Sequence, residues 1–288
     1  NFQSIPSANQ AQFPVQMASV LRKCAALFGT AAAFGVYRYC QRRLEDGHSH
    51  LSDGLRLLWD WPARWNSNWD DVGTGLGGIG GILSLLRQRG LVGAAAEQSR
   101  FSRHLLLVRH AQYEQECLTA LGREQASLTG QRLRELNVRF RALRYSTMTR
   151  ARETAEAILR HLPQGLDVEP CRLLEEGAPV PPEPPAANYQ PPPETFTQDG
   201  RRIESAFRRF FHRAAPDQQS DSYELLVCHA NVIRYFVCRA LQLPPEAWLR
   251  FSLDHASITW VTIRPSGRVA VRYVGNSGHI PADKCTYL

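Results

Sequence analysis

The chain has 288 residues, of which 43% are hydrophobic and 21% are charged, a composition that excludes a collagen-like or a wholly disordered protein. Its net charge of +7 comes almost entirely from arginines spread along the sequence. No basic run with interleaved aromatics and no zinc-finger spacing occurs, so we do not expect nucleic-acid binding. The seven cysteines include no CxxC pair, which favours reduced thiols in a cell interior over a secreted disulfide framework.

Residues 1–43 are expected to form an N-terminal segment with a targeting or anchoring role. The first methionine, Met17, is the expected natural start, and residues 17–43 contain five basic side chains and no acidic one. Residues 24–37 are apolar, but a helix of that length covers only about 21 Å, whereas a bilayer core is roughly 30 Å thick. The composition predicts a mitochondrial address or membrane anchor, outer or inner. Another membrane and a buried helix are the alternatives.

Residues 44–100 have the composition of a linker that contains an aromatic cluster. Four tryptophans lie between positions 59 and 69, and residues 73–81 are rich in glycine. The glycines match the spacing GxGxxG once, but no strand precedes them and no βαβ unit follows. A dinucleotide-binding site is therefore not expected.

Regular structure is expected from Phe101 onward, so residues 101–288 are the predicted folded domain. The patterns predict strands over 104–108, 143–145, 166–169 and 224–228, helices over 120–136, 149–161 and 232–241, a helix from 194 or 200 to 214, and a hairpin of strands 257–264 and 269–274. This order predicts an α/β fold, a three-layer sandwich around a mostly parallel sheet. The proline-rich loop over 179–193 is expected to be a wall of a cleft, with a polyproline ligand as the alternative.

Three predicted strand ends carry side chains suited to phosphoryl transfer. Arg109 and His110 follow the first strand, Arg150 follows the second, and His229 follows the strand over 224–228. Reactive groups in open α/β sheets gather at the carboxyl ends of strands. A neutral imidazole can attack phosphorus when arginines neutralise its oxygens and an acid protonates the leaving oxygen. Each residue alone has an ordinary structural explanation, and their combination favours an enzyme.

Five motifs together resemble the histidine phosphatase superfamily, with its phosphoglycerate mutase-like fold. They are LVRHAQY (107–113), LTALGREQA (118–126), STMTRARET (146–154), LEEGAP (174–179) and VCHANVIRY (227–235). Within that superfamily the sequence is most similar to the mitochondrial serine/threonine protein phosphatases. The resemblance covers residues 101–288. It implies a phosphatase that hydrolyses phosphomonoesters through a phosphohistidine intermediate, with no cofactor.

The resemblance also implies a role for each site residue. His110 is the nucleophile, Arg109 and Arg150 bind the phosphoryl oxygens, His229 stabilises the transferring group, and Glu176 donates and accepts the proton. No metal is needed, because the arginines and His229 supply the positive field that Mg²⁺ supplies in other enzymes. The implied partners are phosphoprotein substrates, stress-signalling kinases among them, other copies of this chain, and the mitochondrial membrane.

Residues 65–70, WNSNWD, resemble an assembly motif, WDxNWD, that docks on the catalytic domain of a neighbouring subunit. Trp65, Asn68, Trp69 and Asp70 match that motif, whereas Asn66 replaces its first acid. The alternative is a linker with exposed tryptophans, which would form a sticky patch. We therefore expect a homo-oligomer.

The catalytic motifs depart from the family pattern at three places. Ala111 replaces a glycine, Glu175 stands where an arginine is frequent, and the segment after Tyr113 is short. The loss of a positive charge beside Glu176 is expected to affect substrate preference or the pKa of that acid.

Two other functions are weighed against a protein phosphatase. A small-metabolite phosphatase or mutase would have the same fold, but a mutase needs more basic residues and a closing tail, which the sequence does not identify. A scaffold with an inert site is the second alternative. The presence of His110, Arg150, Glu176 and His229 argues against it.

Overall fold

The computed structural model describes residues 65–70 and 99–287, and the structural statements below concern these residues. The predicted N-terminal segment, 1–43, and most of the predicted linker lie outside the described residues, so the domain boundaries stay predictions. Among the helices that the structure describes, none is long and apolar enough to cross a membrane.

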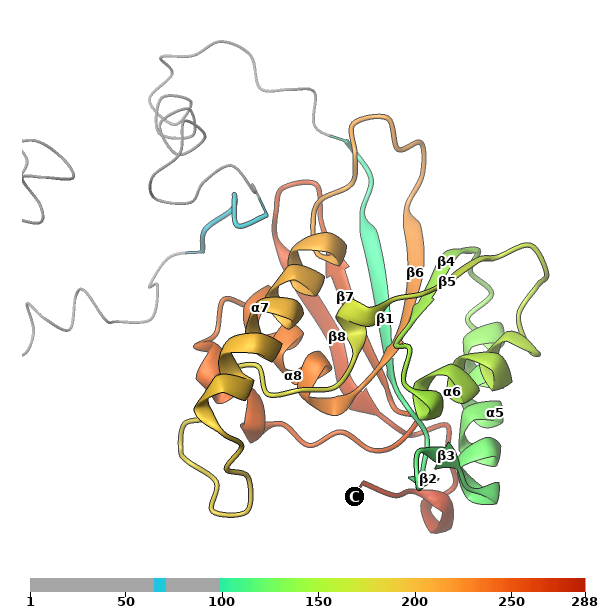
Figure 1. Ribbon diagram of the computed structural model, residues 1–288. Coiled ribbons are helices and arrows are strands. Elements are labelled where there is room, and N and C mark those ends of the chain that lie inside the picture. Colours follow the sequence, from blue (N-terminus) through green and yellow to red (C-terminus); the bar gives the residue numbers. More distant parts are fainter. Residues whose placement is uncertain (1–64, 71–98, 288) are drawn as a thin grey trace, which may run out of the picture. The chain divides into compact units, whose positions relative to one another are not determined.

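A six-stranded mixed sheet forms the middle of the fold, in the order β5-β4-β6-β1-β7-β8 (Figure 1). Its strands are β1 (Arg103–Arg109), β4 (Phe140–Tyr145), β5 (Asp167–Pro170), β6 (Ser222–Cys228), β7 (Ile258–Ile263) and β8 (Val269–Asn276). Strands β5, β4, β6 and β1 are parallel, whereas β7 is antiparallel to both β1 and β8. The prediction of a mostly parallel sheet is confirmed, with the antiparallel hairpin of β7 and β8 at one edge.

Helices cover both faces of this sheet, which confirms the predicted three-layer sandwich (Figure 1). Helices α5 (Ala120–Glu135) and α6 (Thr149–Leu159) lie on one face, and α7 (Pro193–Phe210) and α8 (Ala230–Ala240) lie on the other. Leu106 and Val108 of β1 pack on the face covered by α5 and α6, while Leu105 and Leu107 pack on the face covered by α7 and α8. Because β1 is buried on both faces, its apolar run is continuous rather than alternating.

Local signals in the sequence explain where two of the helices begin. Thr119 caps α5 by accepting a hydrogen bond from the Gly122 N–H at 2.9 Å, as expected for a helix that starts at residue 120. Helix α7 starts at Pro193, whose fixed φ suits a first helical turn. A Cβ at Gly122 would lie 1.9 Å from the Gln112 carbonyl oxygen, so only glycine fits there. This close approach holds the start of α5 against the loop that follows β1.

The structure differs from the sequence predictions most clearly in one strand and a hairpin. Strand β4 starts three residues before the predicted strand. The exposed Arg141 interrupts its apolar run, so the sequence pattern indicates only the second half of the strand. A small hairpin pairs β2 (Tyr113–Glu114) with β3 (Cys117–Leu118), and the sequence does not predict it. Its turn residues, Gln115 and Glu116, adopt φ values of 45° and 80° without the glycine or asparagine that usually marks such turns. Two 3₁₀ helices, Arg172–Leu174 and Pro245–Arg250, lie in connections, and a third, Ala282–Lys284, follows β8.

Candidate active site

The carboxyl ends of β1, β4 and β6 bring the candidate residues to one edge of the sheet. His110 follows β1 and donates its backbone N–H to the Cys228 oxygen at 2.9 Å, and Ser146 follows β4 and donates its N–H to the Val227 oxygen at 2.9 Å. These bonds extend the parallel ladders just beyond the strands. His229, the first residue after β6, therefore lies beside His110, with 5.1 Å between the ring centroids.

The His110 ring is 3% exposed and has one nitrogen free for reaction. Its Nδ1 lies 2.9 Å from the Ala111 carbonyl oxygen. A carbonyl oxygen only accepts hydrogen bonds, so Nδ1 carries the proton and Nε2 holds the lone pair. Burial, followed by the neighbouring His229, holds the pKa of His110 well below its usual value. The ring is therefore neutral at neutral pH, in the form that can attack phosphorus.

Arg109 is buried and is held by three groups. Its Nη1 donates to the Leu253 oxygen at 2.5 Å and to the Tyr287 oxygen at 2.9 Å, and its Nη2 lies 3.1 Å from His255 Nε2. Its buried Nε has no hydrogen-bond partner in the part of the chain that the structure describes. Burial lowers the pKa of Arg109 to about 10, so the side chain keeps its charge at neutral pH. A buried charged donor without a partner is suited to an anion.

Arg150, at the start of α6, supplies a second such donor. Its Nε is also buried and without a partner among the described residues. Its guanidinium lies over the Tyr113 ring, 4.6 Å from the centroid, in cation–π geometry. The Tyr113 ring meets His110 at its edge, with 5.0 Å between centroids. Tyr113 therefore contacts both the candidate nucleophile and the second arginine.

Glu176 lies in the loop between β5 and α7, partly buried at the same edge. Burial raises the pKa of Glu176 above its usual value and outweighs the hydrogen bonds from Gly177 and Asn231 and the charges of Arg150 and Arg109. A carboxyl with a raised pKa keeps its proton to a higher pH, which is what a general acid requires.

His229 is fully buried, and its Nε2 lies 2.7 Å from the Ser146 hydroxyl. Burial, followed by the charge of Arg150, holds the pKa of His229 well below its usual value. Its buried Nδ1 has no hydrogen-bond partner among the residues that are described. The structure thus brings together His110, His229, Arg109, Arg150 and Glu176, whose catalytic roles stay predictions.

The departures from the family pattern have local structural explanations. The φ of Ala111 is not in the left-handed region, so its backbone does not need a glycine. The Ala111 N–H donates to the Thr154 hydroxyl at 3.0 Å. The Glu175 carboxylate accepts a hydrogen bond from the Thr147 hydroxyl and pairs with Arg172 at 3.7 Å. The substituted acid therefore has partners of its own, separate from those of Glu176.

Residues 65–70 lie against the folded domain, away from this edge. Trp69 Nε1 donates to the Gly267 oxygen at 2.7 Å, and its ring lies 5.8 Å from that of Phe207. Asp70 pairs with Arg213 at 2.8 Å. The predicted motif thus has a docking surface, hereafter the Gly267–Arg213 surface, and the structure places it there within one chain.

Asn66 and Asn68 form a local turn, and Asn66 also contacts Gln242 of the folded domain. The Asn66 side-chain oxygen accepts a hydrogen bond from the Asn68 N–H at 3.0 Å, a contact that an aspartate would also make. Asn66 N–H donates to Gln242 Oε1 at 3.0 Å. Trp65 is 37% exposed. The replacement of the first acid by Asn66 therefore preserves the local turn.

Sequence reasoning missed several residues near the candidate nucleophile. His255 lies 5.5 Å from His110 between ring centroids, and Thr286 lies 2.9 Å from His255 Nδ1. Neither belongs to a motif, and no periodicity marks them. Arg234 on α8 is the third missed residue. Burial lowers its pKa, and the charge of Glu176 opposes this shift.

The model of the histidine phosphatase superfamily (branch 1) matches residues 105–179 and 174–276. This chain belongs to that superfamily. A relative from Drosophila mojavensis, named serine/threonine-protein phosphatase Pgam5, mitochondrial, is 44% identical over 279 residues, which are 92% of this chain and 96% of the relative. A protein of the same name from Caenorhabditis briggsae is 54% identical over 190 residues, 65% of this chain and 67% of that one.

Membership of the histidine phosphatase superfamily confirms the resemblance seen in the five motifs. Among solved structures, a phosphoglycerate mutase from Plasmodium falciparum is 32% identical and covers 65% of this chain and 99% of its own, with a TM-score of 0.47. Within the described part of the chain, no group of three or more His, Cys, Asp or Glu is arranged to hold a metal ion.

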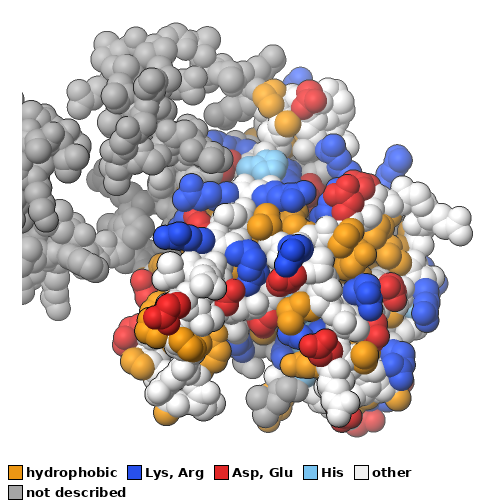
Figure 2. Space-filling view, in the orientation of Figure 1, with side chains coloured by type: hydrophobic (Ala, Val, Ile, Leu, Met, Phe, Trp, Pro, Cys, Tyr) orange, Lys and Arg blue, Asp and Glu red, His pale blue; other side chains and the backbone are white. Residues whose placement is uncertain are grey.

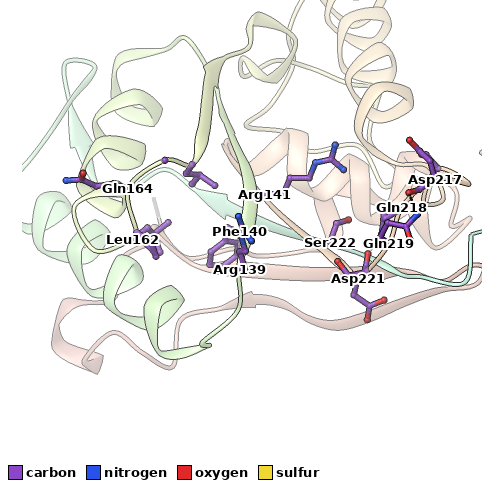
Figure 3. Close-up of a pocket in the computed structure, with 15 residues that line it drawn as sticks. Arg139, Phe140, Arg141, Leu162, Gln164, Asp217, Gln218, Gln219, Asp221 and Ser222 are labelled. Carbon is purple, nitrogen blue, oxygen red and sulfur yellow. Dashed lines mark hydrogen bonds between the residues drawn. The ribbon is translucent and has the colours of Figure 1, made fainter.

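A surface pocket lies apart from the candidate site. A pocket of about 710 Å³ opens at the amino ends of β4 and β6, the opposite ends from His110 (Figure 3). Arginines at 139 and 141 and aspartates at 217 and 221 line it, so its charges are of both signs. Figure 2 likewise shows basic side chains distributed among acidic ones on the face in view.

Proposed function

We propose that this chain is a serine/threonine protein phosphatase that works through a phosphohistidine intermediate on His110. The observation that carries the proposal is the contact of His110 Nδ1 with the Ala111 carbonyl oxygen, which leaves Nε2 for reaction beside two buried arginines whose Nε donors lack partners among the described residues. Protein substrates are favoured over small metabolites because relatives named serine/threonine-protein phosphatases match most of this chain.

In the first step His110 Nε2 attacks the phosphorus atom of a phosphoserine or phosphothreonine. A P–N bond forms while the bond from phosphorus to the side-chain oxygen of the substrate breaks. Glu176 gives its proton to that leaving oxygen, so a neutral hydroxyl departs. Arg109 and Arg150 donate hydrogen bonds to the non-bridging oxygens, whose negative charge they offset throughout the transfer.

In the second step a water molecule attacks the phosphorus atom of the phosphohistidine. The ionised Glu176 accepts the proton of this water, the P–N bond breaks, and inorganic phosphate leaves. His110 regains its lone pair on Nε2, and Glu176 is again protonated. We infer that the arginines supply the charge that a metal ion supplies in other phosphoryl transfers, with His229 as a further hydrogen-bonding group.

Trapping the intermediate tests this proposal. Rapid quenching at alkaline pH during turnover should leave labelled phosphate on His110, and acid should release it, as expected for a phosphoramidate. His110→Ala should remove the label and nearly all turnover, and a chelator should change neither. Substantial turnover by His110→Ala, or its loss with a chelator, would contradict the mechanism.

The proposal also includes location and assembly. We propose that residues 17–43 anchor the chain at a mitochondrial membrane, supported by their basic, acid-free composition and by the word mitochondrial in the relatives' names. A fluorescent reporter fused to these residues should reach mitochondria, and a diffuse cytosolic signal would contradict it.

We further propose that residues 65–70 dock on the Gly267–Arg213 surface of a neighbouring copy, so that the protein is a homo-oligomer.

A further inference from the structure

Arg109 differs from Arg150 in the number of protein groups that hold it. Arginine has five N–H donors and no acceptor. The Nη1 group of Arg109 is used by two carbonyl oxygens, those of Leu253 and Tyr287, and Nη2 lies against His255. Nε and Nη2 share one edge of the planar guanidinium, and Nε is the buried nitrogen without a partner in the described chain. This edge is therefore the one left for two oxygens of a phosphoryl group.

The contact with Arg109 determines which nitrogen of His255 carries the proton. Because arginine can only donate, His255 Nε2 must accept at 3.1 Å, and the proton must be on Nδ1. Nδ1 lies 2.9 Å from the Thr286 hydroxyl oxygen, which then accepts from it. Burial, followed by the charge of Arg109, lowers the pKa of His255 to about 3, so the ring stays neutral in the whole range where the enzyme would work.

Thr286 is itself fixed as an acceptor. The Gln125 side-chain oxygen accepts from the Gln112 N–H at 2.9 Å, which sets the orientation of the amide. Its Nε2 therefore donates to the Lys284 oxygen at 2.7 Å and to the Thr286 hydroxyl at 2.9 Å. The backbone reinforces the arrangement, because the His255 N–H donates to the Thr286 oxygen at 2.7 Å.

We propose that His255 is a positioning residue for Arg109, held in the required tautomer by Thr286, so that residues 284–287 set the geometry of phosphate binding. The inference rests on the proposed function, because it takes Arg109 as a phosphate ligand. The chain Gln125–Thr286–His255–Arg109 is largely buried, and each of its hydrogen bonds has a single permitted direction. A guanidinium fixed in this way presents its Nε edge without having to reorganise when phosphate binds.

Two measurements on the full chain test this inference: the Kd of inorganic phosphate by calorimetry, and kcat and KM for p-nitrophenyl phosphate. His255→Phe keeps a ring but has no acceptor, and it should raise the phosphate Kd and the KM about tenfold. His255→Gln has an acceptor and a donor on one planar group and should stay within about threefold of the wild type. Thr286→Val should weaken phosphate binding in the same direction as His255→Phe, and Thr286→Ser should restore it. His161→Gln is the matched control, because His161 also bonds a hydroxyl, that of Ser127 at 2.8 Å, and should change nothing.

The split between Kd and kcat separates positioning from simple structural damage. A folding defect lowers the active fraction, and so kcat, but leaves the Kd of the remaining folded protein unchanged. If His255→Phe does not fold, Thr286→Val and His255→Gln decide the question. If the wild type is active but folded His255→Phe and Thr286→Val bind phosphate with an unchanged Kd, this inference is overturned and the proposed function is not. A wild type that neither binds phosphate nor turns over would overturn the proposed function with it.

Discussion

His110 is buried and Glu176 is partly buried, and burial shifts their pKa values in opposite directions. The charged form of each group is disfavoured, so the pKa of His110 falls and that of Glu176 rises. Burial therefore favours the unprotonated imidazole and the protonated carboxyl. Those are the two protonation states that the first step of phosphoryl transfer requires.

If Glu176 protonates the leaving oxygen, the effect of removing it depends on the substrate. Glu176→Gln should lower kcat/KM about a hundredfold for a phosphoserine peptide, whose alkoxide is a poor leaving group. It should lower kcat/KM much less for p-nitrophenyl phosphate, whose leaving group needs no proton. Steady-state kinetics with both substrates measures the difference. Equal losses on the two substrates would mean that Glu176 is not the general acid.

The raised pKa of Glu176 also predicts a pH dependence of stability. A carboxyl whose folded-state pKa lies above its usual value near 4.5 favours the folded state at low pH, and this contribution is lost as pH rises through the folded pKa. Glu176→Gln does not titrate, so its melting temperature should match the wild type near pH 4 and exceed it progressively toward pH 8. Each tenfold change in proton affinity corresponds to about 1.4 kcal/mol. Thermal unfolding across this range measures it, with the exposed Glu156→Gln as a control that should show no trend.

Helix α7 holds the loop that carries Glu176. Arg202 on this helix donates to the backbone oxygens of Leu173 at 3.3 Å and Glu176 at 2.9 Å, and also to that of Glu175. One side chain therefore satisfies three carbonyl groups in a segment with little regular structure. The position of Glu176, the proposed general acid, depends on an element that is distant from it in sequence.

Replacing Arg202 by Met should therefore weaken catalysis without removing any group that touches the substrate. The freed carbonyls cost about 1–3 kcal/mol if they stay buried, so the loop should move to reach water. We expect kcat for a phosphoserine peptide to fall about tenfold, with a smaller effect on p-nitrophenyl phosphate. Arg208→Met on the same helix is the control, because Arg208 is mostly exposed and pairs only with Glu204 in the structure described. Equal activity of the two variants would show that α7 does not position Glu176.

How far the sequence predicts each element depends on how local its causes are. The buried strand β1 and the residues at its end could be predicted, because an apolar run and its boundary lie within a few adjacent positions. Glu176 lies in a loop without periodicity, so only the family resemblance indicated it. The contacts of Arg109 with His255 and Tyr287 join positions 146 and 178 apart, and no local pattern records them. The β2–β3 turn was missed because its left-handed residues are not of the types that usually mark such turns.

The contact of residues 65–70 with the Gly267–Arg213 surface connects the linker region to the folded domain. Gly267 has φ of 78°, and a Cβ on it would lie 2.1 Å from the Ser67 oxygen, so the surface fits this segment closely. The Asp70 carboxylate is 5% exposed where it meets Arg213. A buried ion pair contributes specificity, because an unpaired partner is strongly destabilising. The same contacts could be made by residues 65–70 of a neighbouring copy.

A charge exchange between Asp70 and Arg213 distinguishes docking within one chain from docking between copies. Asp70→Arg alone and Arg213→Asp alone should each place like charges together and lower both the oligomer mass, by light scattering, and the specific activity. The double variant in one chain should recover both properties, because the pair is restored in reverse. The decisive sample is an equimolar mixture of the two single variants, in which no chain can form the pair with itself. If residues 65–70 dock on a neighbour, Asp70 of one variant can pair with Arg213 of the other, and mass and activity should recover. If they dock only within their own chain, the mixture should stay as impaired as its components, and the proposal that this segment assembles the oligomer would be wrong.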